Sequence, residues 1–114
     1  MKMPSGGPEQ RRFERIQLPD GKLVCHGVDS VIDGDVTVLG MGGMYIRTPK
    51  IQAMGAQFNI RMRNIADIVE AQCTVRGQGI DGMGVEFVSL QNKHQENLKR
   101  IIERFKSESN GSAA

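Results

Sequence analysis

The sequence predicts a small all-β domain, an antiparallel barrel or sandwich, with one α-helix at its C-terminal end. Two observations lead to this prediction. Through much of residues 22–90 apolar and polar side chains alternate, which is typical of strands with one buried and one solvent-exposed face. From Gln91 onward the apolar residues recur every three or four positions, which is typical of a helix. The 114 residues suit one domain with a modest core.

The clearest alternation lies in residues 55–63 (GAQFNIRMR) and residues 68–76 (IVEAQCTVR). Shorter versions of the pattern occupy residues 22–28, 35–39, 44–48 and 82–90. Cys73 falls on the apolar side of its segment, so its thiol is expected inside the core.

Turn-forming residues separate these segments. Residues 19–21 (PDG) predict a turn, because proline fixes φ and glycine accepts a positive φ. Residues 33–34 (DG) predict a two-residue hairpin loop. Residues 64–67 and residues 77–82 are expected to close two further hairpins. Short strands with such even spacing favour a small barrel or sandwich.

Residues 91–106 (QNKHQENLKRIIERFK) predict one helix of about four turns. Its apolar stripe consists of Leu98, Ile101, Ile102 and Phe105. We expect this stripe to pack on the barrel, with a partner surface as the alternative. Residues 1–9 and 107–114 show no periodic pattern and are expected to be flexible, which leaves residues 10–106 as the domain.

Composition excludes several classes of function. Fifteen Lys and Arg residues against thirteen Asp and Glu residues leave a formal net charge of +2. This balance is too even for the broad basic face that DNA or RNA binding needs, although a local anion site is compatible with it. No apolar run is long enough to span a membrane. The polar, basic residues 1–20 do not form a signal peptide, so we expect a cytoplasmic protein without membrane insertion.

Neither the cysteines nor the histidines form a catalytic or metal-binding pattern. Cys25 and Cys73 are expected to be two buried reduced thiols, with a disulfide between them as the alternative. His26 and His94 belong to no cluster with ligand spacing, and the sequence contains no nucleophile elbow. We therefore expect no enzyme activity, no metal and no cofactor.

Two short stretches are candidates for a binding function. Arg11, Arg12 and Arg15 fall within five residues, and planar guanidinium groups suit phosphate oxygens and guanine edges. The alternative for these arginines is a solvated basic patch. The glycine-rich residues 39–46 (LGMGGMYI) are neither a Walker loop nor a dinucleotide fingerprint, because a strand pattern follows them. They predict a tight turn or bulge, or else a loop that a ligand can approach closely.

Three stretches together resemble a known family. Residues 11–15 (RRFER), 42–49 (GGMYIRTP) and 82–90 (GMGVEFVSL), followed by a helix, are similar to the PilZ domain. The resemblance spans residues 10–106. It implies a six-stranded antiparallel β-barrel with a C-terminal helix, which agrees with the alternation described above. It also implies a bacterial receptor for the second messenger cyclic di-GMP.

The resemblance implies a ligand site whose first part is an RxxxR motif. This motif falls on Arg11 and Arg15, with Arg12 beside them. In the family such arginines hold guanine edges and phosphates, so the resemblance implies that these three form an arginine clamp.

The second part of the family's site is D/N-x-S-x-x-G, which falls on residues 38–43 (VLGMGG). The final Gly43 is retained. Val38 stands where the family has Asp or Asn, and Gly40 stands where it has Ser. Valine accepts no hydrogen bond from guanine, and Gly40 offers an N–H but no hydroxyl.

A second placement of this motif uses residues 35–40 (DVTVLG), with Asp35, Thr37 and Gly40 at the motif positions. Its polar residues fit better, but it needs three extra residues before residues 44–48. An odd shift also turns side chains to the other face of a strand. We therefore prefer the first placement, while noting that a bulge in the glycine-rich turn would bring Asp35 or Thr37 into the site.

Three functions remain open. The first is a cyclic di-GMP receptor that acts as an adaptor and passes the signal to a protein partner. The second is a PilZ-like interaction module that no longer binds the nucleotide, with a partner in motility, pilus or signalling machinery. The third, an RNA-binding barrel, is disfavoured because its polar strand faces carry almost no aromatic rings. We accordingly expect no DNA or RNA partner.

Overall fold

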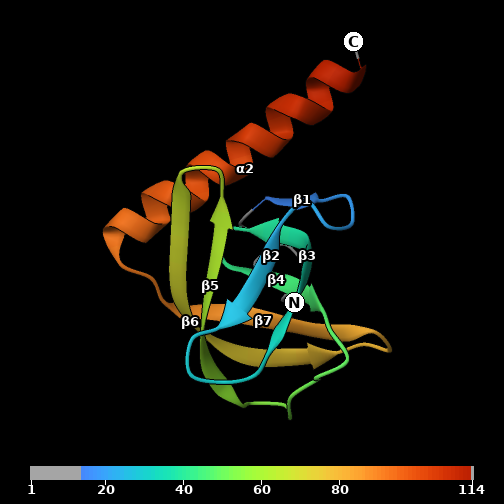
Figure 1. Cartoon of the computed structure of the whole chain (residues 1–114), viewed down its shortest axis with the longest axis vertical. Helices are drawn as coiled ribbons and strands as arrows, with labels where there is room; N and C mark the ends of the chain where they lie inside the picture. Colours follow the sequence, from blue (N-terminus) through green and yellow to red (C-terminus); the bar gives the residue numbers. More distant parts are fainter. Residues whose placement is uncertain (1–13, 114) are drawn as a thin grey trace, which may run out of the picture.

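The computed structural model describes residues 14–113. Over this part of the chain, seven strands are followed by one helix (Figure 1). The elements are β1 (Arg15–Gln17), β2 (Val24–Gly27), β3 (Asp33–Gly40), β4 (Gly43–Arg47), β5 (Gln57–Asn64), β6 (Asp67–Gln78), β7 (Gly82–Ser89) and α2 (Asn92–Ala113). All of the alternating segments form strands, so the prediction of an all-β domain with a C-terminal helix is confirmed.

Six of the strands close into a barrel. They follow the order β3-β2-β5-β6-β7-β4, and β4 pairs back onto β3, with every pair antiparallel. The predicted six-stranded antiparallel barrel is therefore confirmed. The short β1 is an addition to it, because β1 pairs with β3 alone. It lies on the same edge of β3 as β2, since Val38 has Gln17 on one side and Tyr45 on the other.

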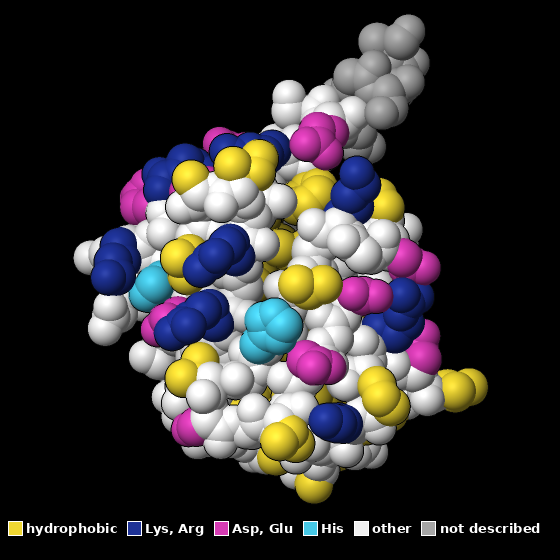
Figure 2. Space-filling view, viewed as in Figure 1, with side chains coloured by type: hydrophobic (Ala, Val, Ile, Leu, Met, Phe, Trp, Pro, Cys, Tyr) yellow, Lys and Arg dark blue, Asp and Glu magenta, His cyan; other side chains and the backbone are white. Residues whose placement is uncertain are grey.

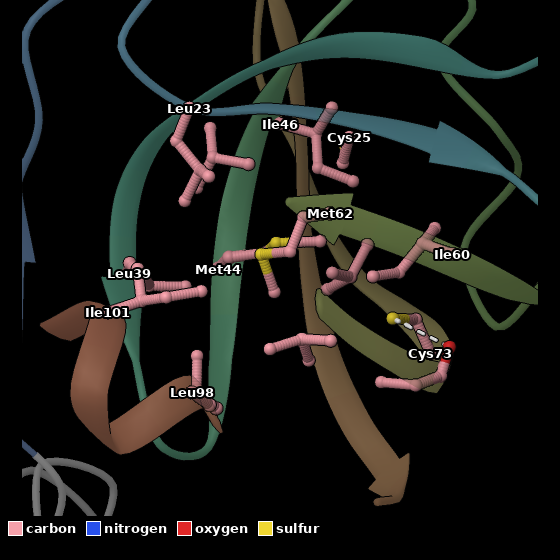
Figure 3. Packing of buried hydrophobic residues seen from close by; sticks show 14 of the residues in the cluster. Leu23, Cys25, Leu39, Met44, Ile46, Ile60, Met62, Cys73, Leu98 and Ile101 are labelled. Carbon is pink, nitrogen blue, oxygen red and sulfur yellow. Dashed lines mark hydrogen bonds between the residues drawn. The ribbon is translucent and has the colours of Figure 1, made fainter. Parts of the chain in front are cut away.

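The core fills the inside of the barrel (Figure 3). Cys25 and Cys73 both point inward, are fully buried and are free, which confirms the two reduced thiols rather than the disulfide. The helical stripe is buried with them, which confirms that α2 packs on its own barrel. The stripe consists of Leu98, Ile101, Ile102 and Phe105.

Three of the four predicted turns are confirmed: residues 19–21, 64–67 and 77–82 join the strands as expected. The prediction of a hairpin loop at residues 33–34 is wrong, because both residues belong to β3. Gly34 pairs with Cys25 and lies so close to β4 that a Cβ atom there would collide with the carbonyl oxygen of Arg47. Close packing explains this glycine, and the turn lies at residues 28–32 instead.

α2 is longer than the four turns expected. It has 22 residues, and residues 107–113 continue the helix where a flexible tail was expected. In Figure 1 the helix lies across one end of the barrel and its C-terminal part runs beyond it.

Polar groups as well as the apolar stripe hold α2 in place. Arg104 Nη1 donates to Asn64 Oδ1 at 2.7 Å, and Arg100 Nε donates to Asp67 Oδ1 at 3.2 Å. Nearer the start of the helix, Asn97 Nδ2 donates to the carbonyl oxygen of Ile68 at 2.8 Å. The helix is therefore tied to the hairpin between β5 and β6 from Asn97 to Arg104.

Candidate functional site

The two motif segments meet at the pairing of β1 with β3. Arg15 lies directly opposite Gly40, and Gln17 lies opposite Val38. Such antiparallel partners have Cα atoms about 4.5–5.5 Å apart. The side chains of Arg15 and Gln17 are exposed, whereas Ile16 between them packs against the core. The second arginine of RxxxR therefore stands beside the glycine-rich turn on the outer face of the barrel.

Arg11 and Arg12 lie outside the described residues. Their place in the candidate site therefore stays a prediction from the sequence. Arg15 is the member of the arginine group for which the structure gives a position.

A bulge in β3 decides which side chains share this outer face. Val36 pairs with Ile46 and Val38 pairs with Tyr45, so Thr37 is one extra residue in β3. As a result, the inward positions are Val36 and Leu39, three residues apart, and both are buried. Thr37 and Val38 between them are both partly exposed.

The bulge changes the comparison of the two motif placements. Asp35 and Val38 are an odd number of residues apart, and we expected such positions to face opposite sides of the strand. With one extra residue between them, both are partly exposed on the outer face. The bulge lies at Thr37 in β3 and not in the glycine-rich turn where one was considered.

Asp35 already has a partner on this face. Arg47 Nη2 donates to Asp35 Oδ2 at 2.8 Å, and Arg47 Nη1 lies 3.0 Å from Asp20 Oδ2. The hydrogen bonds from Arg47, first to Asp20 and then to Asp35, raise the pKa of the guanidinium. Asp35 is therefore the acceptor of a side chain in the neighbouring strand, which leaves it less available to a ligand.

The glycine-rich segment forms the predicted tight turn between β3 and β4. Close contacts with neighbouring segments explain two of its glycines. A Cβ atom on Gly40 would lie 2.7 Å from the carbonyl oxygen of Glu14, and one on Gly43 would collide with the carbonyl oxygen of Val85. Glu14, just before β1, and Val85 of β7 approach the turn too closely for a side chain at these two positions.

Tyr45 is a member of this surface that the motifs do not include. It lies opposite Val38 across the β3–β4 pair, and its hydroxyl donates to Asp81 Oδ1 at 2.7 Å. That hydrogen bond raises the pKa of the Tyr45 phenol. The sequence contained a signal for it, because Tyr45 is the aromatic residue at a polar-face position of its alternating segment.

α2 also reaches the N-terminal motif. Lys106 Nζ lies 2.8 Å from Glu14 Oε1, and Glu14 directly precedes Arg15. The hydrogen bond to Glu14 is the main cause of a raised Lys106 pKa. Both side chains are substantially exposed, so this ion pair contributes little to stability. Its significance is positional, because it joins the helix to the segment that carries the arginines.

Within the described residues, no group of three or more His, Cys, Asp or Glu side chains is placed to hold a metal ion. In the same part of the chain, α2 lacks the run of apolar residues that a membrane-spanning helix needs. The candidate site combines guanidinium, backbone and aromatic groups, and a guanidinium pairs with anionic groups and stacks on planar ones.

Comparison with protein families decides the classification. The model of the PilZ domain matches residues 9–104. The chain belongs to the PilZ domain family. PilZ domains are receptor modules and not enzymes, so membership supports the expectation that this domain has no catalytic activity. A search of curated proteins finds no significant match.

Two solved structures share the PilZ fold of this chain. YcgR from Escherichia coli, in complex with c-di-GMP, superposes with a TM-score of 0.74 at 19% identity. The match covers 91% of this chain and 49% of YcgR, so the chain spans about half the length of that protein. The Legionella protein Lpg0364, described as uncharacterized, has a TM-score of 0.63 at 12% identity, over 84% of this chain and 97% of that one.

Proposed function

We propose that this PilZ domain is a receptor for cyclic di-GMP that passes the signal to a protein partner. The observation that carries the proposal is the pairing of Arg15 with Gly40. It joins the RxxxR segment to the glycine-rich turn, the two segments that the family's site requires. Family membership and the c-di-GMP complex of the structurally similar YcgR support the same ligand.

In this proposal the arginines Arg11, Arg12 and Arg15 form a clamp. A guanidinium donates two parallel hydrogen bonds to phosphate oxygens, or to O6 and N7 of guanine, and also stacks on flat rings. Cyclic di-GMP offers all three features. In the same proposal the turn from Gly40 to Gly43, which lies beside Arg15, forms the floor of the site.

The same surface predicts a weakened site. At the preferred motif position Val38 accepts no hydrogen bond from guanine, and Gly40 has no hydroxyl. A good two-pronged base contact is worth about 1–3 kcal/mol, and each 1.4 kcal/mol is about tenfold in affinity. Losing the Asp/Asn and Ser contacts therefore weakens binding by roughly ten- to several hundred-fold relative to a complete motif.

The second candidate function is a PilZ interaction module without nucleotide binding. Two observations favour it specifically: Val38 faces outward where an acceptor is needed, and the nearby Asp35 is held by Arg47. In this case the barrel and α2 would contact a protein partner regardless of the second messenger.

Isothermal titration of cyclic di-GMP into the purified protein tests the proposal, with GTP and cyclic di-AMP as controls. Saturable binding of cyclic di-GMP alone supports the receptor. Absence of heat up to several hundred micromolar ligand rejects it in favour of the nucleotide-independent module.

A further inference from the structure

A different surface, at the hairpin between β5 and β6, has features of an interaction site. Ile65 at the tip of this hairpin has φ of 55°, and it is the one non-glycine residue with positive φ among those the structure describes. A β-branched side chain disfavours this conformation strongly. Asn, Asp or Gly would occupy the position at lower cost.

Ile65 is also exposed to solvent. Its side chain has 77% relative exposure, so the isoleucine gains little from packing inside its own domain. Neither the positive φ nor the exposure to solvent favours an isoleucine at this position. Backbone outliers of this kind cluster at functional sites, so the outlier makes Ile65 a candidate for contact with another molecule.

The hairpin that carries Ile65 has three arginines and one aspartate near it, an excess of positive charge. Arg63 precedes it in β5 with an exposed side chain, and α2 brings Arg100 and Arg104 to the same hairpin. The carboxylate of Asp67 lies 3.2 Å from Arg100 Nε and 3.5 Å from Arg104 Nη1, so it compensates one charge of the three. Figure 2 shows apolar side chains at this end of the molecule with Lys and Arg side chains beside them and Asp or Glu side chains next to the basic ones.

The arginines on α2 are held in fixed positions. Arg104 bonds both Asn64 and Asp67, and Arg100 bonds Asp67 and the side chain of Asn97. Their side chains therefore lose less conformational entropy when a partner binds than free arginines would. Together with Arg63 they form an arginine collar at the hairpin that carries Ile65, and their fixed positions suit a contact with defined geometry.

We propose that this basic tip, formed by residues 63–67 with Arg100 and Arg104, docks a protein segment in which acidic side chains surround an apolar residue. The apolar residue packs on Ile65, and the carboxylates meet the arginine collar. A second copy of this chain fits poorly, because two such tips would repel each other. A lipid surface also fits poorly, since one exposed isoleucine supplies little of the apolar area that stable membrane anchoring requires.

The proposal is independent of the nucleotide site, which lies on β1, β3 and β4. A synthetic peptide in which glutamates flank a central leucine and phenylalanine is the probe, and a peptide with lysines in place of the glutamates is its control. Fluorescence anisotropy measures binding to the full chain. The glutamate peptide is expected to bind saturably and the lysine peptide is not.

Two matched variants locate the contact. Ile65→Asn keeps the hairpin, because asparagine adopts positive φ readily, and it is expected to weaken binding by at least about tenfold. Ile80→Asn changes a fully exposed isoleucine at the tip of the β6–β7 hairpin, at the other end of β6, and should leave binding unchanged. Arg63→Glu should weaken binding as Ile65→Asn does.

Several outcomes overturn the proposal. Absence of saturable binding of the glutamate peptide, equal binding by the Ile65→Asn and wild-type chains, or equal binding of the two peptides each rejects it. Ile65-dependent binding to vesicles containing phosphatidylserine, without peptide binding, assigns the tip to a membrane. Ile65-dependent dimerisation in sedimentation equilibrium assigns it to a second copy.

Discussion

Arg15 and Gly40 are cross-strand partners in the antiparallel pair of β1 and β3. Gly40 has no side chain, and a Cβ atom there would also approach Arg15 Cγ at 3.4 Å. That distance is an ordinary contact, so the glycine is required by the carbonyl oxygen of Glu14, which a Cβ atom would approach to 2.7 Å. This relationship connects the two sequence motifs in space.

Replacing Arg15 tests whether it binds a ligand or supports the fold. Arg15→Ala should abolish binding of cyclic di-GMP in isothermal titration, and Arg11→Ala should do the same. Because Arg15 is exposed, its replacement should change the free energy of unfolding by no more than about 0.5 kcal/mol. Arg63→Ala is the matched control and should retain binding. A fall of several degrees in the melting temperature of Arg15→Ala would instead give this arginine a structural role.

In the preferred motif placement, Val38 is the position at which an acceptor for guanine can be introduced. Val38→Asp should tighten cyclic di-GMP binding by about tenfold or more, because its side chain is outward and partly exposed. Adding Gly40→Ser restores the hydroxyl but brings a Cβ atom within 2.7 Å of the Glu14 carbonyl oxygen. The double variant should therefore gain less affinity than two independent contacts would give.

Asp35→Ala separates the two motif placements. If residues 38–43 carry the motif, this change should release Arg47 without reducing nucleotide affinity. Loss of affinity in Asp35→Ala, together with no gain in Val38→Asp, would favour the placement on residues 35–40.

Asp67 should matter more for stability than other acidic residues on the barrel. It is 8% exposed and contacts both Arg100 and Arg104, so Asp67→Ala removes the carboxylate that these two guanidinium groups share. We expect a loss of about 1–3 kcal/mol in the free energy of unfolding, measured by urea denaturation. Glu70→Ala removes an exposed ion pair with Arg61 and should cost less than about 1 kcal/mol. Equal losses would show that the anchor of α2 is not at Asp67.

The two thiols should resist modification in the folded state and lower its stability at high pH. Burial is the largest cause that raises the pKa of Cys25 and of Cys73 from 9.0 to about 12. Because the pKa is raised in the folded state, the unfolded chain releases these protons at a lower pH than the folded chain does. The stabilising contribution is therefore complete below pH 9 and is lost as the pH rises toward 12.

Thiol chemistry checks this prediction at pH 8. Reaction with a disulfide reagent such as dithionitrobenzoate should be much slower for the native protein than for the protein in urea. At higher pH, the variant with both cysteines replaced by alanine should lose less stability than the wild type. Fast labelling of the native protein would mean that the barrel opens at this site.

Most of the barrel follows from alternation in the sequence, because each strand has one face in the core. Where the structure differs from the predicted strands and turns, contacts between strands are the reason. Residues 33–34 carry a hairpin signature, yet Gly34 is required where β4 passes close to β3. Thr37 forms a bulge that local alternation does not reveal, since two outward residues in succession have no separate signature.

The sequence also did not predict the C-terminal part of α2 or the polar contacts that hold this helix on the barrel. The sequence of residues 107–113 (SESNGSA) contains no apolar stripe, so no hydrophobic period marks them as helical. Asn97, Arg100 and Arg104 bond the β5–β6 hairpin, and such contacts depend on neighbours that are distant in sequence. In the candidate site, Arg15 and Gly40 were assigned from the family's motifs, and the structure adds their pairing and the presence of Tyr45.

The barrel closes through six strands, and β1 is added outside that closed ring. Residues 15–17 can therefore detach from β3 while every ladder of the barrel stays intact. Opening of this segment is a sub-global event, so its amide protons should exchange with deuterated solvent long before those of β5 and β6. A ligand held by Arg15 would slow that exchange, and its binding energy would order one edge segment and not the whole domain.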